Sequence, residues 1–147
     1  MSNSVEILLV EDNLDDIELA LHALRKNKLA NHVEVVRDGA EALAFLFAEG
    51  NYADRKKNHT PRLILLDLKL PKIDGLEVLR RVKSDPDLHT IPIVVMTSSD
   101  QERDIVESYE YGVNSYIRKP VDFDEFVEVI KQLGFYWLIL NQPPNNA

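Results

Sequence analysis

The chain has 147 residues with 45% hydrophobic and 29% charged side chains, which predicts one globular domain with a substantial core. Its 17 basic and 25 acidic residues give a net charge of −8, which argues against nucleic acid or an anionic membrane surface as the main partner. The absence of cysteine excludes disulfides, and without a signal-peptide pattern or an apolar run of membrane-spanning length we expect a cytoplasmic protein with no membrane partner.

Short apolar runs alternate with amphipathic segments along the chain. In chain order, the pattern predicts a strand at 6–10, a helix at 15–26, a strand at 33–36, a helix from 39 to 47, a strand at 63–66, a helix at 76–84, a strand at 93–96, a helix capped by Ser99 or Asp100, a strand at 114–117 and a helix capped by Asp122. Residues 49–61 show no periodicity and are predicted to form an exposed loop. Five strands alternating with five helices predict an α/β fold, a parallel sheet covered on both faces.

Two of the predicted strands end on carboxylates. The strand at 63–66 is followed by Asp67, and the strand at 6–10 is followed by Glu11 and Asp12. Because ligands of open α/β sheets bind outside the carboxyl ends of the strands, we expect these side chains to form one cation site. The plainer interpretation is that each Asp only caps the helix that follows it.

A hydroxyl and an ammonium group follow the last two predicted strands. Thr97 comes after the strand at 93–96, and Lys119 lies just beyond the strand at 114–117. Each alone has an ordinary explanation, as a strand end and as a solvated surface charge. Together with the carboxylates, they suit a dianionic group bound to an oxygen of Asp67. The carboxylates repel one another, and a ligand set made only of oxygen predicts Mg²⁺ as the cation that holds them together.

Four short motifs resemble the receiver domain of two-component response regulators, and the resemblance covers residues 5–134. Each motif is weak alone, but their order and spacing are specific. The motifs are Val10-Glu11-Asp12-Asn13, the sequence LDLKLPKIDG at 66–75, Met96-Thr97-Ser98 and Lys119-Pro120. The resemblance implies a flavodoxin-like, doubly wound sheet of five strands in the order 2-1-3-4-5, with five helices.

The resemblance also implies roles for individual residues at the acidic end of the sheet. Asp67 corresponds to the phosphoacceptor, the carboxylate that attacks a phosphoryl group. Glu11 and Asp12 correspond to the acidic pair that binds Mg²⁺ with Asp67. The backbone carbonyl of Lys69 corresponds to a further metal ligand.

A second group corresponds to the residues that respond to phosphorylation. Thr97 matches the switch hydroxyl, and Lys119 matches the lysine that contacts the phosphoryl group. Tyr116 matches the switch aromatic residue, although it also fits a plain half-buried strand position. Pro120 matches a position that is usually preceded by a cis bond in the family.

Six large apolar residues, 135–140, follow the predicted receiver domain at 1–134. If the last helix simply continues, its inward stripe, which begins at Phe123, passes through Trp137 and Leu140, and the other apolar side chains face elsewhere. We therefore predict that residues 135–147 form an apolar extension that makes a homodimer. The predicted dimer residues are Phe135, Tyr136, Trp137, Leu138 and Ile139. The alternative is a tail folded back onto its own domain.

The implied function is that of a single-domain response regulator, not a conventional enzyme, which accepts a phosphoryl group from a sensor histidine kinase. The tail and the loop at 49–61 resemble stand-alone regulators paired with bacterial, especially cyanobacterial, phytochromes, which implies a phytochrome as the kinase. Two alternatives are a phosphorelay intermediate that passes phosphate to a histidine phosphotransfer protein, and a receiver-like binding module that takes no phosphate. Phosphatases of the haloacid-dehalogenase class also use an Asp nucleophile with Mg²⁺, but they place a second Asp where this chain has Lys69.

Overall fold

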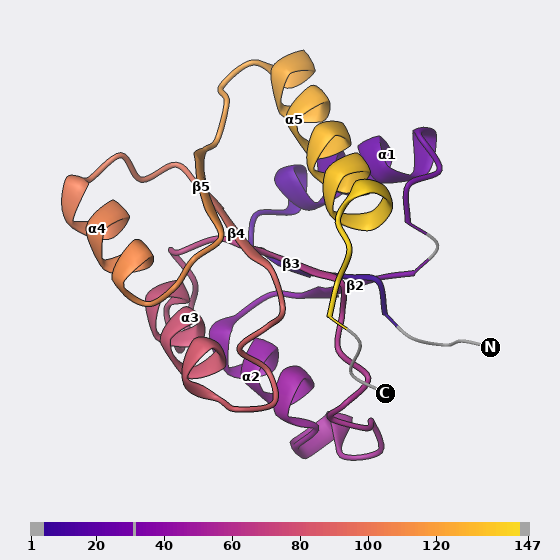
Figure 1. Ribbon diagram of the computed structural model, residues 1–147. Coiled ribbons are helices and arrows are strands. Elements are labelled where there is room, and N and C mark those ends of the chain that lie inside the picture. Colours follow the sequence, from indigo (N-terminus) through magenta and orange to yellow (C-terminus); the bar gives the residue numbers. More distant parts are fainter. Residues whose placement is uncertain (1–4, 31, 145–147) are drawn as a thin grey trace.

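A parallel sheet forms the centre of the structure (Figure 1). The computed structural model describes residues 5–30 and 32–144, and the strands within them are β1 (Ile7–Val10), β2 (Val33–Val36), β3 (Leu63–Leu66), β4 (Ile93–Thr97) and β5 (Ser115–Arg118). Their order across the sheet is β2-β1-β3-β4-β5, and every neighbouring pair is parallel. This order confirms the expected flavodoxin-like arrangement.

Helices cover both faces of the sheet (Figure 1). They are α1 (Leu14–Lys26), α2 (Gly39–Phe47), α3 (Gly75–Ser84), α4 (Glu102–Glu110) and α5 (Phe123–Phe135). Helices α1 and α5 pack side by side on one face, and α2 and α3 cover the other. A 3-10 turn at Gly50–Tyr52 follows α2, and a π-helical turn at Tyr136–Leu140 continues α5. None of the helices in the described part of the chain is both long and apolar enough to cross a membrane.

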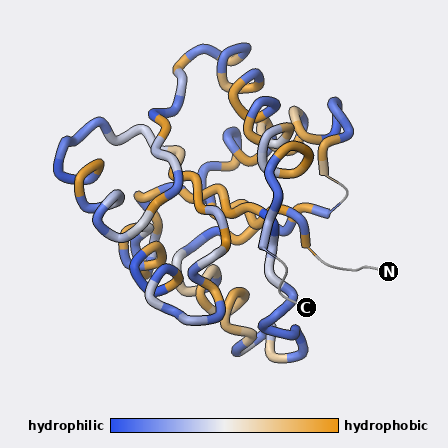
Figure 2. Tube along the Cα trace, in the orientation of Figure 1, coloured by the Kyte–Doolittle hydropathy of each residue, from blue (hydrophilic) through white to orange (hydrophobic). Residues whose placement is uncertain are grey.

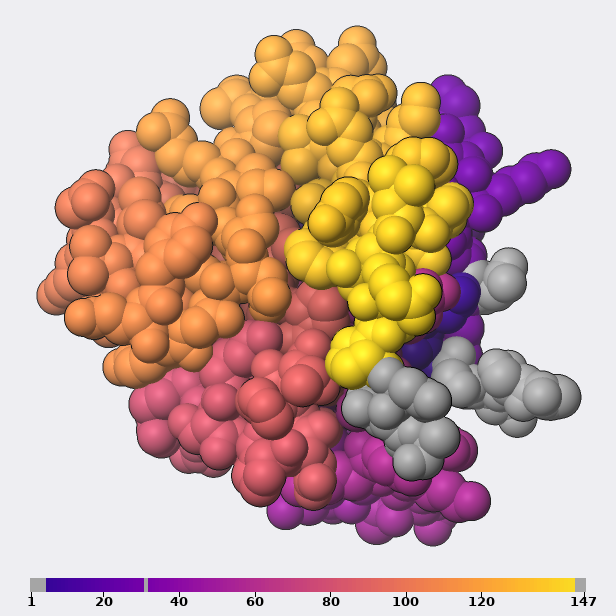
Figure 3. Space-filling model, in the orientation of Figure 1, coloured from indigo at the N-terminus to yellow at the C-terminus, as the bar shows by residue number. Residues whose placement is uncertain are grey.

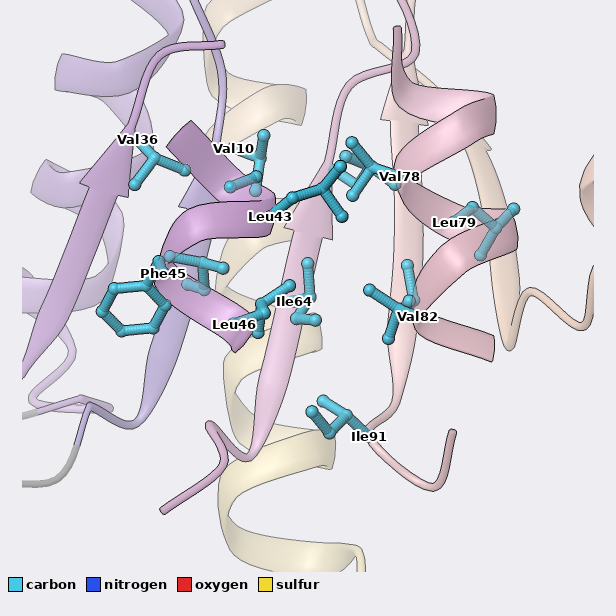
Figure 4. Packing of buried hydrophobic residues seen from close by; sticks show 14 of the residues in the cluster. Val10, Val36, Leu43, Phe45, Leu46, Ile64, Val78, Leu79, Val82 and Ile91 are labelled. Atoms are coloured by element: carbon cyan, nitrogen blue, oxygen red, sulfur yellow. The ribbon is translucent and has the colours of Figure 1, made fainter. Parts of the chain in front are cut away.

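Alternate residues of the central strands face opposite helical layers. On β1, Leu8 belongs to the apolar cluster under α2 and α3, whereas Leu9 belongs to the cluster under α1 and α5. Figure 4 shows the first of these layers, with Leu43 of α2 and Val78 of α3 directed toward the strands. The hydropathy colouring accordingly turns orange along the buried strands (Figure 2). Because both faces are covered, these strands are apolar throughout, which explains the uninterrupted runs in the sequence.

The observed helix caps test whether Asp12 and Asp67 only cap the helices that follow them. Asn13 caps α1 and Asp74 caps α3, and each side chain accepts the backbone N–H three residues further on. Asp122 caps α5, as predicted, and its side chain accepts the N–H of Glu125. Since Asn13 and Asp74 fill the capping positions after β1 and β3, Asp12 and Asp67 are not helix caps, and the plainer interpretation of these carboxylates is wrong.

Helix α4 begins differently from the prediction. Its N-cap residue is Gln101, which makes no side-chain capping hydrogen bond, so neither Ser99 nor Asp100 caps the helix. The Ser99 hydroxyl donates to the Asp104 carboxylate inside α4 at 2.6 Å, but the backbone N–H that it accepts is that of Gln101, which precedes the first helical residue, Glu102. The following strand, β5, starts at Ser115, one residue later than predicted.

The segment at 49–61 is only in part the exposed loop that the sequence predicts. Tyr52 packs edge to face against Phe45, with ring centroids 5.2 Å apart, and its hydroxyl donates to Glu41. The Arg55 guanidinium lies over the same phenylalanine ring, 3.7 Å from its centroid. These aromatic and cation–π contacts attach the first half of the loop to α2.

The C-terminal run departs from the predicted helical register. A continuing α-helix places Leu140 inward, but in the structure Leu140 is 61% exposed and Leu138 only 5% exposed. The buried positions of α5, Phe126, Ile130 and Gly134, recur every four residues, and the π-helical turn at Tyr136–Leu140, which is wider than an α-helical turn, continues this spacing to Leu138. Phe123, also expected in the core, is 57% exposed because it begins α5 at the end that stands clear of the sheet (Figure 1). Leu138 and the half-buried Trp137 therefore pack on the α1–α5 layer of their own domain.

Candidate functional site

The predicted site residues meet at the carboxyl edge of the sheet. The N–H of Asp67 donates to the carbonyl of Val10 at 3.0 Å, so Asp67 leaves β3 beside Glu11, the residue that follows β1. The N–H of Lys119 donates to the carbonyl of Thr97 at 2.8 Å, which joins the ends of β5 and β4. Four strand ends thus supply carboxylate, hydroxyl and ammonium groups to one place.

The three predicted metal-binding carboxylates form a cluster. Oxygen atoms of Glu11, Asp12 and Asp67 all lie within 4.8 Å of one another, and Glu11 and Asp67 are only 4% and 7% exposed. Burial raises the pKa of Glu11 to about 7; the hydrogen bond with Lys119 opposes this shift, and the charge of Asp67 adds to it. The backbone of Lys69 adjoins the cluster, because its N–H donates to Asp67 at 3.2 Å. This oxygen-only set fits a hard divalent cation, which offsets the mutual repulsion.

Lys119 lies among carboxylates. Its Nζ is 2.7 Å from Glu11 Oε1, 2.7 Å from Asp16 Oδ2 and 3.0 Å from Asp67 Oδ2. Burial disfavours the charge on this lysine, but the hydrogen bonds to Asp16 and Glu11 and the charge of Asp67 outweigh that cost and hold its pKa above the ordinary value. The peptide bond between Lys119 and Pro120 is trans, so the cis bond that the resemblance implies is not found here.

Asp16 is a member of this site that the sequence did not single out. It lies in the first turn of α1, next to the exposed Asp15. The sequence does contain a signal: Asp16 is four residues before the buried Ala20, on the inward stripe of the helix, where an apolar residue is expected.

The predicted switch residues belong to a hydrogen-bond network. Thr97 is fully buried at the end of β4, and its hydroxyl oxygen lies 3.4 Å from the N–H of Ser99, which donates to it. The Tyr116 hydroxyl donates to the carbonyl of Ser99 at 3.1 Å, and the Ser99 hydroxyl donates to Asp104. The network therefore joins the ends of β4 and β5 to α4. Ser99 was predicted only as a possible helix cap, and Asp104 was not predicted, because it lies inside a helix and outside any motif.

The predicted dimer residues divide into two groups. Phe135, Tyr136 and Ile139 are between 46% and 55% exposed, whereas Trp137 is half-buried and Leu138 is buried in the domain's own core. Figure 3 shows the C-terminal segment, in yellow, at the molecular surface. The exposed members form an apolar surface, while Leu138 is unavailable to a partner.

This fold and its acidic edge define a class of protein. Residues 7–131 match the response regulator receiver domain. The match covers most of the chain and agrees with the observed strand order. The chain therefore belongs to the receiver-domain family of two-component response regulators.

Within this family, the chain is similar to phytochrome-associated members. It is 41% identical over 132 residues to response regulator Rcp1 of Synechocystis sp., covering 90% of this chain and 88% of that protein. The crystal structure of the phosphorylated cyanobacterial phytochrome response regulator RcpA matches with a TM-score of 0.89 and 44% identity, over 97% of this chain and 99% of the other. The Mn²⁺-bound form of Rcp1 matches with a TM-score of 0.88 and 39% identity, over the same shares of the two chains.

Proposed function

We propose that this chain is a single-domain response regulator that accepts a phosphoryl group on Asp67 and changes conformation as a result. The observation that carries the proposal is the environment of Asp67: one oxygen is 3.0 Å from the Lys119 ammonium, and Glu11 and Asp12 complete the acidic cluster. A carboxylate held between a fixed cation and a cation-binding pair is suited to attack phosphorus. The protein is itself the acceptor in each cycle, so we describe it as a phosphoacceptor and not as a conventional enzyme.

The proposed reaction is a phosphoryl transfer from a histidine of the kinase. One oxygen of Asp67 forms a bond to phosphorus, and the bond between phosphorus and the histidine nitrogen breaks. The electron pair of that bond stays on the nitrogen, and the product is an acyl phosphate on Asp67. Lys119 is in position to contact the phosphoryl oxygens, and because the transition state is loose, positioning and charge neutralisation are the main contributions required.

We propose Mg²⁺ as the bound cation, with Glu11, Asp12, Asp67 and the carbonyl of Lys69 as its protein ligands. Support comes from the oxygen-only cluster and from the relative that has been crystallised with Mn²⁺. Bound Mg²⁺ supplies positive charge next to the phosphoryl oxygens.

The proposed switch uses Thr97 and Tyr116. A phosphoryl group on Asp67 attracts the Thr97 hydroxyl, which releases the N–H of Ser99 and alters the site where Tyr116 is bound. The hydrogen bond from Ser99 to Asp104 then carries the change to α4. The affected surface is formed by α4, β5 and α5.

The proposed partners follow from the family. Receiver domains work with histidine kinases, and the similarity to RcpA and Rcp1 supports a phytochrome as the kinase. We place this exchange in the cytoplasm, where such kinases obtain ATP. A role as a relay to a histidine phosphotransfer protein is a second candidate, because an acyl phosphate on Asp67 is chemically competent to phosphorylate a histidine.

The decisive experiment is phosphorylation by acetyl phosphate, followed by intact mass. We expect the parent to gain phosphate only with Mg²⁺, and Asp67→Asn to gain none, because an amide does not attack phosphorus. Asp54→Asn, a change of the same kind at an exposed loop position, is the matched control and should behave as the parent. Stable phosphate on Asp67→Asn contradicts the assignment. A parent that takes no phosphate favours the alternative of a receiver-like binding module.

We further propose that residues 1–134 are the receiver domain and that the tail, 135–147, contributes to a homodimer. The support is the exposed apolar surface of Phe135, Tyr136, Ile139 and Leu140, which adjoins α5. Burying one such side chain contributes about 1.5–3 kcal/mol, so several together offset the entropy cost of association.

Sedimentation of substituted proteins tests the dimer better than truncation, because a chain that ends at Gly134 also loses the buried Leu138. We expect the double variant Ile139→Ser and Leu140→Ser to be monomeric at concentrations where the parent is a dimer. Leu14→Ser, at a residue 59% exposed on α1, is the control for loss of an exposed apolar side chain. A parent that stays monomeric with and without phosphate leaves the tail as part of its own domain.

A further inference from the structure

The Lys119 ammonium has a contact that lies outside the acidic cluster. Asp16 Oδ2 is 2.7 Å from Nζ, as close as Glu11 and closer than Asp67 at 3.0 Å. Glu11 and Asp67 follow strands, whereas Asp16 belongs to the first turn of α1. The Asp16 side chain is 23% exposed, compared with 6% for Glu11 and 8% for Asp67, so it is the most solvent-exposed of the three partners of Lys119.

The three contacts differ in what happens when a divalent cation arrives. Glu11 and Asp67 belong with Asp12 to the cluster that fits a cation, but Asp16 does not. A cation bound by Glu11 and Asp67 competes with Lys119 for their oxygens and repels its ammonium group. Asp16 is then the one carboxylate of the three that still pairs with Lys119. Because the lysine side chain is long and flexible, its ammonium group has no fixed position without that contact.

We propose that Asp16 is a positioning residue that holds the Lys119 ammonium at the site while Mg²⁺ occupies Glu11 and Asp67, so that Lys119 meets the incoming phosphoryl group. This inference rests on the proposed function. It gives Asp16 a role through Lys119 and no contact with the phosphoryl group or the metal ion.

The chain provides a matched control in Asp15. Asp15→Asn and Asp16→Asn remove the same charge from neighbouring positions of the same helical turn, but Asp15 is exposed. The α1 cap is Asn13, which accepts the backbone N–H of Asp16, so neither substitution removes the capping side chain. A difference between the two variants therefore reports the side-chain contact with Lys119.

The sign of the kinetic effect separates positioning from simple charge. Acetyl phosphate is an anion, so the loss of a nearby carboxylate reduces repulsion and speeds its reaction with Asp67 if charge alone matters. Loss of the positioning contact instead slows the reaction, because Lys119 is no longer oriented toward the phosphoryl group.

The first measurement is the rate of phosphorylation by acetyl phosphate at saturating Mg²⁺. We expect Asp16→Asn to be slower than the parent by about five- to tenfold and Asp15→Asn to stay within about twofold. In a Lys119→Met background, Asp16→Asn should cause no further slowing, because the lysine that it positions is absent. If Asp16→Asn reacts as fast as Asp15→Asn, or slows the reaction equally in both backgrounds, the inference is wrong.

The second measurement does not depend on phosphorylation. Nitrogen-15 NMR of lysine ammonium groups, with Lys119 assigned from the Lys119→Met variant, reports whether Nζ is held in an ion pair. We expect the Lys119 signal to persist when Mg²⁺ binds the parent or Asp15→Asn, and to disappear only in Asp16→Asn with Mg²⁺. Persistence in Asp16→Asn, or loss in the parent, overturns the inference while the proposed function stands. If amide signals at Glu11 and Asp67 of the parent do not respond to Mg²⁺, the proposed metal site fails and the inference fails with it.

Discussion

Two lysines of this protein each contact three oxygen atoms, one at the carboxyl ends of the strands and the other at the amino ends. Their pKa values are shifted in opposite directions. Lys119, at the carboxyl edge, faces three carboxylates that hold its pKa above the ordinary value. Lys83, at the end of α3, donates to the carbonyls of His89 and Ile91 and to the side-chain oxygen of Asn114, at 2.8 to 3.0 Å. Burial lowers the pKa of Lys83 to about 8.

The difference shows what a neutral acceptor and a charged acceptor each contribute. Carbonyl oxygens satisfy the hydrogen bonds of an ammonium group but do not repay the cost of taking its charge out of water. Carboxylates do both, and they also bind cations and react with phosphorus. The amino edge is therefore suited to joining α3 to the segments that precede β4 and β5, and the carboxyl edge to chemistry that depends on charge.

The largest effect we expect concerns stability without metal. Lys119→Met leaves Glu11, Asp16 and Asp67 facing one another, and breaking a buried ion pair in this way costs about 3–5 kcal/mol. Mg²⁺ should restore part of this loss, because it neutralises the same cluster. Urea denaturation in chelator and in Mg²⁺ measures both quantities. If chelator and Mg²⁺ give the same loss, Lys119 and the metal ion are not coupled through the cluster.

The next effect concerns phosphorylation. We expect Lys119→Met to accept phosphate about 10- to 100-fold more slowly and to lose the conformational response, because a fixed positive charge no longer meets the phosphoryl group. Lys83→Met should stay within about twofold of the parent, since Lys83 contacts residues of the opposite edge. Rates with acetyl phosphate, together with the tyrosine absorption change on phosphorylation, test this contrast. Equal responses from Lys119→Met and the parent would refute the role of Lys119.

A smaller effect is expected at the amino edge. Lys83→Met removes the donor from three oxygen acceptors, and we expect a loss of about 1–2 kcal/mol in the free energy of unfolding. Because no carboxylate is involved, Mg²⁺ should leave this loss unchanged. Denaturation of Lys83→Met in chelator and in Mg²⁺ provides the comparison, and dependence on the metal ion would show that the two edges are coupled.

The last effect is the pH dependence of that same contribution. The pKa of Lys83 is about 8 in the folded protein, whereas its ordinary value, which applies to the unfolded chain, is 10.5. Between pH 8 and pH 10.5 the unfolded chain therefore binds more protons than the folded protein. The free energy of unfolding contributed by Lys83 should therefore rise with pH in this window. The stability difference between the parent and Lys83→Met should grow from about pH 8 to about pH 10. A difference that stays flat means that the folded protein does not shift this pKa.

The sequence was most informative where chemistry follows a buried strand. Asp67, Glu11 and Thr97 could be located because a strand covered on both faces is an unbroken apolar run with a visible end. Asp16 could not be separated from Asp15 in this way, because two acids in a row look alike until the phase of the helix is known. The inward position of Ala20 supplies that phase, and it sets Asp16, but not Asp15, four residues earlier on the same inward stripe.

Contacts between distant segments could not be predicted from the sequence for a different reason. Lys83 and Asn114 are 31 residues apart, and neither lies in a motif, so their hydrogen bond depends on how α3 and β5 are placed. The predicted register of residues 135–140 was wrong because it assumed that the helix keeps 3.6 residues per turn. In the structure the inward residue is Leu138, four residues after the buried Gly134, and not Leu140, while the dimer stays a prediction.

That turn also gives the protein an optical reporter of its own. Trp137 is the one tryptophan in the sequence, and its ring lies 4.9 Å from the ring of Tyr136, close enough to receive excitation energy from it. Indole emission shifts in colour when water is excluded, so fluorescence from this single indole reports burial of the tail without an added dye. A change in that emission on phosphorylation would show, in real time, that an event at Asp67 has reached the other end of α5.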